Sequence, residues 1–257
     1  MLPLSAQGQL WPFDQIVSFG DSLTDQGNVV KTYGPLLSTF GVTTNAYNEN
    51  FYDDGRITNG PVWAELLSLQ LGAGTLERST NGGTNYAWAA TRSGSGFSSF
   101  ILPNLLTQVT GYVGSNSGHN TKLFTIWSGG NDLLDVIGGS YDMATVASTV
   151  AANIAQAVTN LAGAGAKYLL VHNLPNLGLK PDYVGNASLQ NEATDLAFAV
   201  NVQLELNLQQ VENEFSGLTI VRGDTFGLIT DIVANPSFYG LTNVTETAYT
   251  PDSTEDG

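Results

Sequence analysis

Two long helical patterns, each ended by glycine and followed by a short apolar run, constrain the fold of this chain most. Apolar residues recur at three- and four-residue spacing over residues 143–161 and again over 189–215. Short apolar runs follow them at 167–171 and 218–221. Helices that alternate with short strands indicate a parallel sheet, because parallel strands need a long connection between them.

Five short apolar runs predict five strands, which is a complete small sheet. The candidate strands are Gln15–Phe19, Thr84–Trp88, Lys122–Trp127, Lys167–Val171 and Leu218–Val221. Right-handed crossovers place helices on both faces of such a sheet. We therefore expect an α/β fold, a three-layer α/β/α sandwich around a five-stranded parallel sheet.

The composition suits one domain and excludes several kinds of function. A chain of 257 residues with 42% hydrophobic content can bury one continuous core, so we expect a single domain over residues 1–257. Its formal net charge of −15, with only 8 Lys and Arg, opposes binding to polyanions, and we expect no nucleic-acid partner. The absence of cysteine excludes thiol nucleophiles, disulfides and thiolate metal sites.

Membrane, cofactor and metal signals are missing as well. No apolar stretch approaches the ~20 residues that cross a bilayer, and residues 1–6 lack the pattern of a signal peptide. The low lysine content would suit an exported protein, but the compartment stays open. There is no phosphate loop, dinucleotide fingerprint or His-Glu-x-x-His zinc motif, so we expect neither a cofactor nor a metal.

One serine follows the first predicted strand directly. Residues 19–27 read Phe-Gly-Asp-Ser-Leu-Thr-Asp-Gln-Gly, which predicts a strand end and a turn that holds Ser22. In open parallel sheets the binding crevice lies beyond the carboxyl ends of the strands, where Ser22 falls. A serine nucleophile needs a base to take its proton and donors to hold the oxyanion. A helix starting just after Ser22 would direct backbone N–H groups at that charge.

Three further segments follow predicted strands and reach the same edge. Ala89 and Ala90 follow the second strand, residues 129–132 (Gly-Gly-Asn-Asp) follow the third, and His172 with Asn173 follows the fourth. Each segment alone would be an ordinary turn or helix cap. Together, in this order, they place a serine, amide donors and one histidine at one sheet edge.

In these motifs the chain resembles the GDSL, or SGNH, family of ester hydrolases. Gly-Asp-Ser-Leu at 20–23 matches the first motif, and residues 127–132 look like the Gly-x-Asn-Asp motif. Further similarity lies in residues 55–63, 173–178 and 234–240. The resemblance implies a flavodoxin-like sandwich, a Ser22 acyl-enzyme, and oxyanion donors from the Ser22 N–H, the Ala90 N–H and the Asn131 amide.

The chain departs from the family pattern at Ala90. Alanine stands where the family usually has glycine, although its N–H is still available as a donor. We expect the exchange to be tolerated if φ is negative at this position, with the Cβ near the approaching substrate.

The general base is the larger departure. The family places an Asp-x-x-His pair after the fifth strand, where the histidine takes the serine proton. The two histidines here, His119 and His172, have Asn116 and Leu169 three positions before them. We expect His172 to be a partly buried structural residue and His119 a solvated loop residue. The resemblance predicts a truncation before the motif, with loss of a helix that would cover the sheet, marginal stability and possible self-association.

Three functions remain open from the sequence. The first is a serine ester hydrolase, and the family's substrates make lipid esters, acyl thioesters and acetylated sugars the candidates. The second is a pseudoenzyme that binds an ester or a carbohydrate without turnover. The third is an acidic interaction domain in which Gly-Asp-Ser-Leu is an incidental turn.

Overall fold

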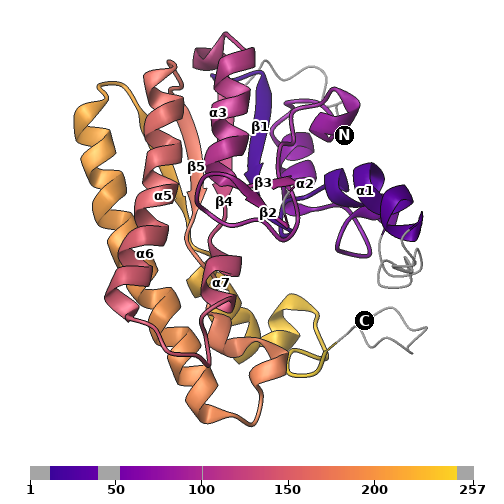
Figure 1. Cartoon of the computed structure of the whole chain (residues 1–257), viewed down its shortest axis with the longest axis vertical. Coiled ribbons are helices and arrows are strands. Elements are labelled where there is room, and N and C mark those ends of the chain that lie inside the picture. Colours follow the sequence, from indigo (N-terminus) through magenta and orange to yellow (C-terminus); the bar gives the residue numbers. More distant parts are fainter. Residues whose placement is uncertain (1–11, 40–52, 100, 248–257) are drawn as a thin grey trace.

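The computed structural model of the chain describes residues 12–39, 53–99 and 101–247, which form an α/β fold with parallel strands (Figure 1). The main sheet has the order β1-β4-β5-β6. Its strands are β1 (Gln15–Gly20), β4 (Lys122–Trp127), β5 (Tyr168–His172) and β6 (Thr219–Gly223). The register pairs Gly20 with Trp127 and His172 with Gly223, so the carboxyl ends of the four strands meet at one edge.

The sheet has four strands rather than the five expected. Segment 84–88 runs beside β1, with Ser18 N–H donating to Thr84 O at 3.0 Å and Tyr86 N–H donating to Ser18 O at 2.7 Å. Trp88 N–H also donates to Gly20 O at 3.1 Å, but the segment forms only isolated bridges, from Asn85 to Ser18 and to Arg78. The ladder is interrupted because Gly20 N–H, which would donate to Tyr86 O in a regular parallel pair, donates to the Gln108 side chain at 3.0 Å instead.

Three helices cover one face of the sheet: α3 (Leu105–Ser115), α5 (Met143–Gly163) and α6 (Ala187–Glu214). Figure 1 shows them side by side in front of the strands. The helices α5 and α6 confirm the two long helices that the apolar spacing predicts. Each begins at a capping side chain, because Asp142 accepts from Thr145 N–H at 2.7 Å and Asn186 accepts from Leu189 N–H at 3.2 Å.

On the other face, α2 (Trp63–Gln70) and Phe13 pack against β1 and β4. The helix α1 (Asn28–Thr39) packs through Val29 against Ala89 and Leu102. The helix α7 (Thr225–Ala234) follows β6 at the carboxyl edge. The remaining short elements are α4 (Gly130–Leu134), β2 (Phe97–Ser98), β3 (Leu102–Pro103), η3 (Asp53–Gly55), η4 (Ser79–Asn81), η5 (His119–Thr121), η6 (Leu177–Leu179), η7 (Pro181–Tyr183) and η8 (Pro236–Tyr239).

Strands β5 and β6 are buried on one face and partly open on the other. Leu169 and Ile220 are buried beneath α5 and α6, whereas their neighbours Leu170 and Val221 point the other way. Leu170 is half-buried and Val221 is 54% exposed. No helix within residues 12–39, 53–99 and 101–247 combines the length and apolar character needed to cross a membrane.

Candidate active site

The end of β1 fixes the place of Ser22. Gly20 has φ 152°, and a Cβ there would lie 2.2 Å from the carbonyl oxygen of Trp127 on the paired strand, so only glycine fits. The Gln108 side chain accepts from Gly20 N–H at 3.0 Å and donates to Gly20 O at 2.9 Å. Ser22 therefore stands two residues beyond a rigidly held strand end.

The helix expected directly after Ser22 starts later. Residues 21–27 form a bent loop, and α1 begins at Asn28. The Asp25 carboxylate occupies the helix start, accepting from the N–H groups of Gly27 at 2.8 Å and Asn28 at 2.6 Å. It also accepts from Ala89 N–H at 2.8 Å. The positive end of α1 is therefore directed at Asp25 and not at a charge on Ser22.

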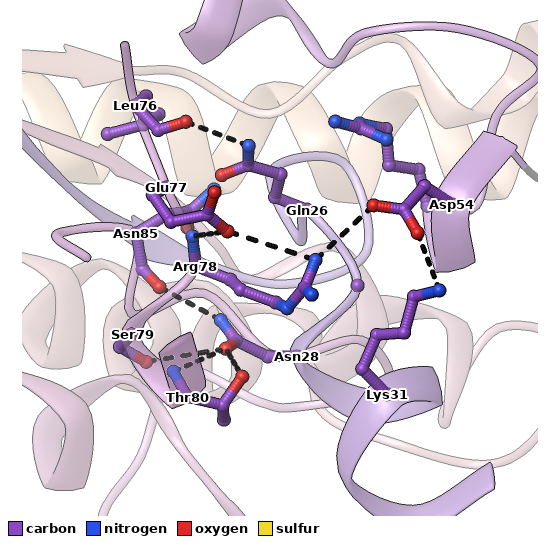
Figure 2. A network of polar contacts seen from close by, with 12 residues as sticks. Gln26, Asn28, Lys31, Asp54, Leu76, Glu77, Arg78, Ser79, Thr80 and Asn85 are labelled. Carbon is purple, nitrogen blue, oxygen red and sulfur yellow. Dashed lines mark hydrogen bonds and ion pairs between the residues drawn. The ribbon is translucent and has the colours of Figure 1, made fainter. Parts of the chain in front are cut away.

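Buried amides tie this loop to the segment that carries Ala90 (Figure 2). Asn28 Nδ2 donates to the carbonyl oxygens of Asn85 and Ala87, both at 2.9 Å. Its Oδ1 accepts from the N–H and hydroxyl of Thr80 at 3.1 and 2.9 Å. Figure 2 also shows Arg78 reaching Asp54 at the edge of the network. The serine loop and the Ala90 segment are thus held together as one unit.

A second set of contacts joins the Ala90 segment to α4. Gly129, at φ 111°, turns the chain from β4 into α4. Asn131 Nδ2 donates to Thr91 O at 2.9 Å, and the Asp132 carboxylate accepts from the N–H and hydroxyl of Ser93 at 2.9 and 2.7 Å. Asn131 is therefore held against the turn that follows Ala90.

Ala90 adopts a left-handed conformation. Alanine is expected to be tolerated here if φ is negative, and this condition is not met. The φ of Ala90 is 63°, which non-glycine residues adopt at a cost. In the described part of the chain, neither the Ala90 N–H nor the Ser22 N–H has a hydrogen-bond partner. Asn131 Nδ2 keeps its second hydrogen as well. The sheet edge therefore offers three unused N–H donors, which are groups of the kind that an oxyanion hole employs.

A pocket of about 490 Å³ opens at this edge. Ser22 and Asn131 line it, whereas Ala90 is not among its lining residues. Its apolar lining residues are Leu23, Trp127, Leu134, Leu174, Pro175, Leu177, Leu179, Pro181, Ile229, Ile232, Val233 and Val244. Sequence reasoning missed the three from α7, Ile229, Ile232 and Val233. The apolar spacing at 229, 232 and 233 marks one face of a helix and was a usable signal.

Buried carboxyl groups lie in and near the loop of residues 21–27 that carries Ser22, and sequence reasoning did not predict their burial. Asp21, which lines the pocket, is only 3% exposed, and burial raises its pKa to about 7. Nearby Asp132 and Asp25 raise it further, whereas the Leu23 N–H, which donates at 3.1 Å, lowers it. Burial raises the pKa of Asp25 and Asp132 too. At neutral pH the serine therefore stands beside a carboxyl group that is partly protonated.

Neither histidine is placed as a base. His172 packs against the rings of Trp63 and Trp127, at centroid distances of 4.5 and 5.0 Å, and these two rings also contact each other. Burial lowers its pKa to about 4, and within the described residues neither ring nitrogen has a partner. His172 is thus a neutral histidine without an orienting carboxylate in the described part of the chain.

The prediction for His119 was wrong. Its side chain is 7% exposed and packs against Tyr112 and Phe124 instead of lying in solvent. It precedes β4, so it lies at the opposite end of that strand from the pocket. Aromatic neighbours from α3 and β4 bury it.

Comparison with known proteins agrees with the geometry. The family model of GDSL-like lipases and acylhydrolases matches residues 16–256. The chain belongs to this family. It is 31% identical over 196 residues to a phosphatidylcholine-sterol acyltransferase of Aeromonas hydrophila, covering 76% of this chain and 54% of that protein. It is 30% identical over 255 residues to esterase EstA of Pseudomonas aeruginosa, and the match covers 90% of this chain and 38% of that protein.

A GDSL esterase/lipase of Arabidopsis thaliana is 26% identical over 273 residues, covering 90% of this chain and 71% of that protein. This chain thus spans about half of the length of the acyltransferase, and less of EstA. GDSL-family membership accounts for the Gly-Asp-Ser-Leu turn, the Gly-Asn-Asp segment and the α/β architecture together.

Proposed function

We propose that this GDSL-family chain carries a serine ester hydrolase site in which Ser22 is the nucleophile. The Ser22 Oγ attacks the ester carbonyl, the alcohol leaves with a proton, and water then hydrolyses the acyl-enzyme. The N–H groups of Ser22 and Ala90 and the Asn131 amide hold the oxyanion. The observation that carries this proposal is that all three donors keep an unused hydrogen in the described structure, at the sheet edge where Ser22 stands.

The pocket favours an ester with an apolar part. Leucine, isoleucine, valine and proline side chains form most of its lining, and Lys180 is the one cationic residue among the described residues that line it. An acyl chain would contact the α7 wall, which consists of Ile229, Ile232 and Val233, while the ester carbonyl stays at Ser22. We therefore propose esters of medium-length acyl chains as better substrates than acetate esters.

The alternative is an impaired pseudoenzyme, and the histidines support it. Turnover needs a base, and His172 has a pKa of about 4 and no carboxylate partner in the described residues. An oxyanion hole without a triad leaves about 10³–10⁴-fold acceleration over water. The expected activity of the 257 residues alone is accordingly slow.

A fluorophosphonate probe tests the nucleophile. With imidazole as external base, we expect mass spectrometry to find the adduct on Ser22, and Ser22→Ala to remove it. Ser95→Ala, which removes an exposed serine, is the matched control and should label normally. A probe that labels other serines equally, or none, would instead support an acidic interaction domain.

Added imidazole separates the hydrolase from the pseudoenzyme. If only the base is lacking, imidazole should accelerate hydrolysis of a nitrophenyl octanoate above the rate that Ser22→Ala shows in the same buffer. Equal rates for the two proteins would favour binding without turnover.

A further inference from the structure

Arg92 makes an unusual set of contacts two residues after Ala90. Its Nη1 donates to the carbonyl oxygen of Ala90 at 2.7 Å. Its Nε and Nη2 donate to the two carboxylate oxygens of Asp135, at 2.8 and 2.7 Å. The guanidinium thus bridges the left-handed turn and the residue that follows α4, in the planar two-bond geometry that arginine and a carboxylate prefer.

The backbone of Arg92 is fixed independently of its side chain. Asn104 Oδ1 accepts from Arg92 N–H at 3.0 Å, and Leu105 N–H donates to Arg92 O at 2.9 Å. Both partners belong to the start of α3, which is buried in the main core. The guanidinium therefore binds the Ala90 carbonyl from a backbone that is fixed in place, and the Asp135 carboxylate orients the guanidinium.

Ala90 needs such a restraint because its conformation is unfavourable for alanine. At φ 63° the Cβ crowds the backbone, and a free alanine would return to negative φ. That change would rotate the peptide planes on both sides of Ala90, including the one that carries its N–H. A charge-assisted hydrogen bond to the Ala90 carbonyl opposes this rotation.

We propose that Arg92, oriented by Asp135, is a positioning residue that holds Ala90 in the left-handed conformation and so keeps its N–H available to an oxyanion. The inference rests on the proposed function for the role of the Ala90 N–H, but the restraint itself is a property of the fold. Arg92 acts through Ala90 and does not touch the reacting atoms.

The test measures fluorophosphonate labelling of Ser22 in the full chain, with imidazole as external base. We expect Arg92→Ala to slow labelling roughly tenfold, the scale of one hydrogen bond to a charged group. Arg92→Lys, which cannot bridge both partners, should slow it as well. In the Ala90→Gly background, Arg92→Ala should have less than about a threefold effect, because glycine reaches positive φ without restraint.

Arg222→Ala is the matched control. Arg222 has a similar side-chain exposure, 31% against 34% for Arg92, and also bridges carboxylates, those of Glu205 and Glu212. Loss of an ion pair with general destabilisation would affect both variants, but only Arg92→Ala should slow labelling. Equal slowing by Arg92→Ala and Arg222→Ala overturns the inference, and so does equal slowing by Arg92→Ala in the parent chain and in the Ala90→Gly background.

Amide hydrogen exchange of a peptide covering residues 88–93 distinguishes failure of the restraint from failure of the proposed function. Faster exchange in Arg92→Ala than in the parent chain supports the restraint, whether or not Ser22 labels. If Ser22 never labels, that failure refutes the proposed function but not the restraint. Unchanged exchange together with unchanged labelling removes the role of Arg92.

Discussion

At the scale of single residues, the candidate site combines strain and burial in a few side chains. Ala90 is held at φ 63°, and Asp21 is buried beside Ser22 with a pKa of about 7. Both features are unfavourable for folding, and both lie near Ser22. Functional sites commonly hold such unfavourable residues, because the surrounding fold can sustain them.

Glycine at position 90 should stabilise the chain. Alanine at positive φ is strained, and the relief outweighs the extra freedom that glycine gives the unfolded chain, so Ala90→Gly should raise the free energy of unfolding by about 0.5–1 kcal/mol. Urea denaturation measures this. Ala164→Gly, at the end of α5 with φ −81°, is the control and should destabilise. A loss of stability in Ala90→Gly would mean that position 90 carries no strain.

The raised pKa of Asp21 predicts a pH-dependent stability. The folded chain holds a proton that the unfolded chain, with a pKa of 3.8, has released. This contribution is fully present below pH 4 or so and is lost as the pH rises through about 7, which lowers the free energy of unfolding by up to about 4 kcal/mol. Asp21→Asn should remove most of that slope in urea titrations across this range.

Asp142→Asn is the matched control for the sign. Hydrogen bonds from Thr145 lower the pKa of Asp142, so its contribution is present above its unfolded pKa and is lost as the pH falls. Asp142→Asn should therefore leave the decline between about pH 4 and pH 7 in place. If Asp21→Asn and the parent chain decline in parallel, other buried acids carry the effect.

At the scale of elements, the sequence predicted what its periodic patterns determine. The helices α5 and α6 and four strands lie where apolar spacing and glycine stops put them. Segment 84–88 does not form a regular strand because the Gln108 side chain accepts from the Gly20 N–H that would continue the ladder, which no periodicity reveals. The late start of α1 has the same kind of cause, since the Asp25 carboxylate sets it.

The site was predictable to a similar degree. The places of Ser22 and Asn131 follow from strand ends and the edge that parallel strands share. The α7 wall, the bridge from Arg92 to Asp135 and the raised pKa of Asp21 depend on contacts between segments far apart in sequence. Spacing along the chain carries no information about such contacts.

Asn28 should be essential to the elements that hold the site. Asn28→Ala leaves the Ala87 carbonyl and the Thr80 N–H without their partner, and the Asn85 carbonyl with only the Ser79 N–H, which should lower the free energy of unfolding by about 2–4 kcal/mol. Gln156→Ala, at an exposed position of α5, should change it by less than about 0.5 kcal/mol. Urea denaturation of both variants checks this, and a similar small loss in both would mean that solvent replaces the Asn28 amide.

At the scale of the whole molecule, the open face of β5 and β6 predicts self-association. Leu170 and Val221 are register partners on that face, and Val221 is 54% exposed. A parallel sheet is normally covered on both faces, and several hundred Å² of open apolar surface corresponds to several kcal/mol at about 25 cal/mol per Å². We expect light scattering to show an average mass that rises with protein concentration, and more steeply in salt, which screens the net charge of −15.

A lysine on the open face tests where the contact lies. Val221→Lys should lower the average mass, whereas Val202→Lys, at a 48% exposed position on the outer side of α6, should not. Dispersal by Val202→Lys alone would place the contact on α6 instead. A dye-silent monomer with sharp two-state melting at all concentrations would mean that the face is already covered and that the chain is stable by itself.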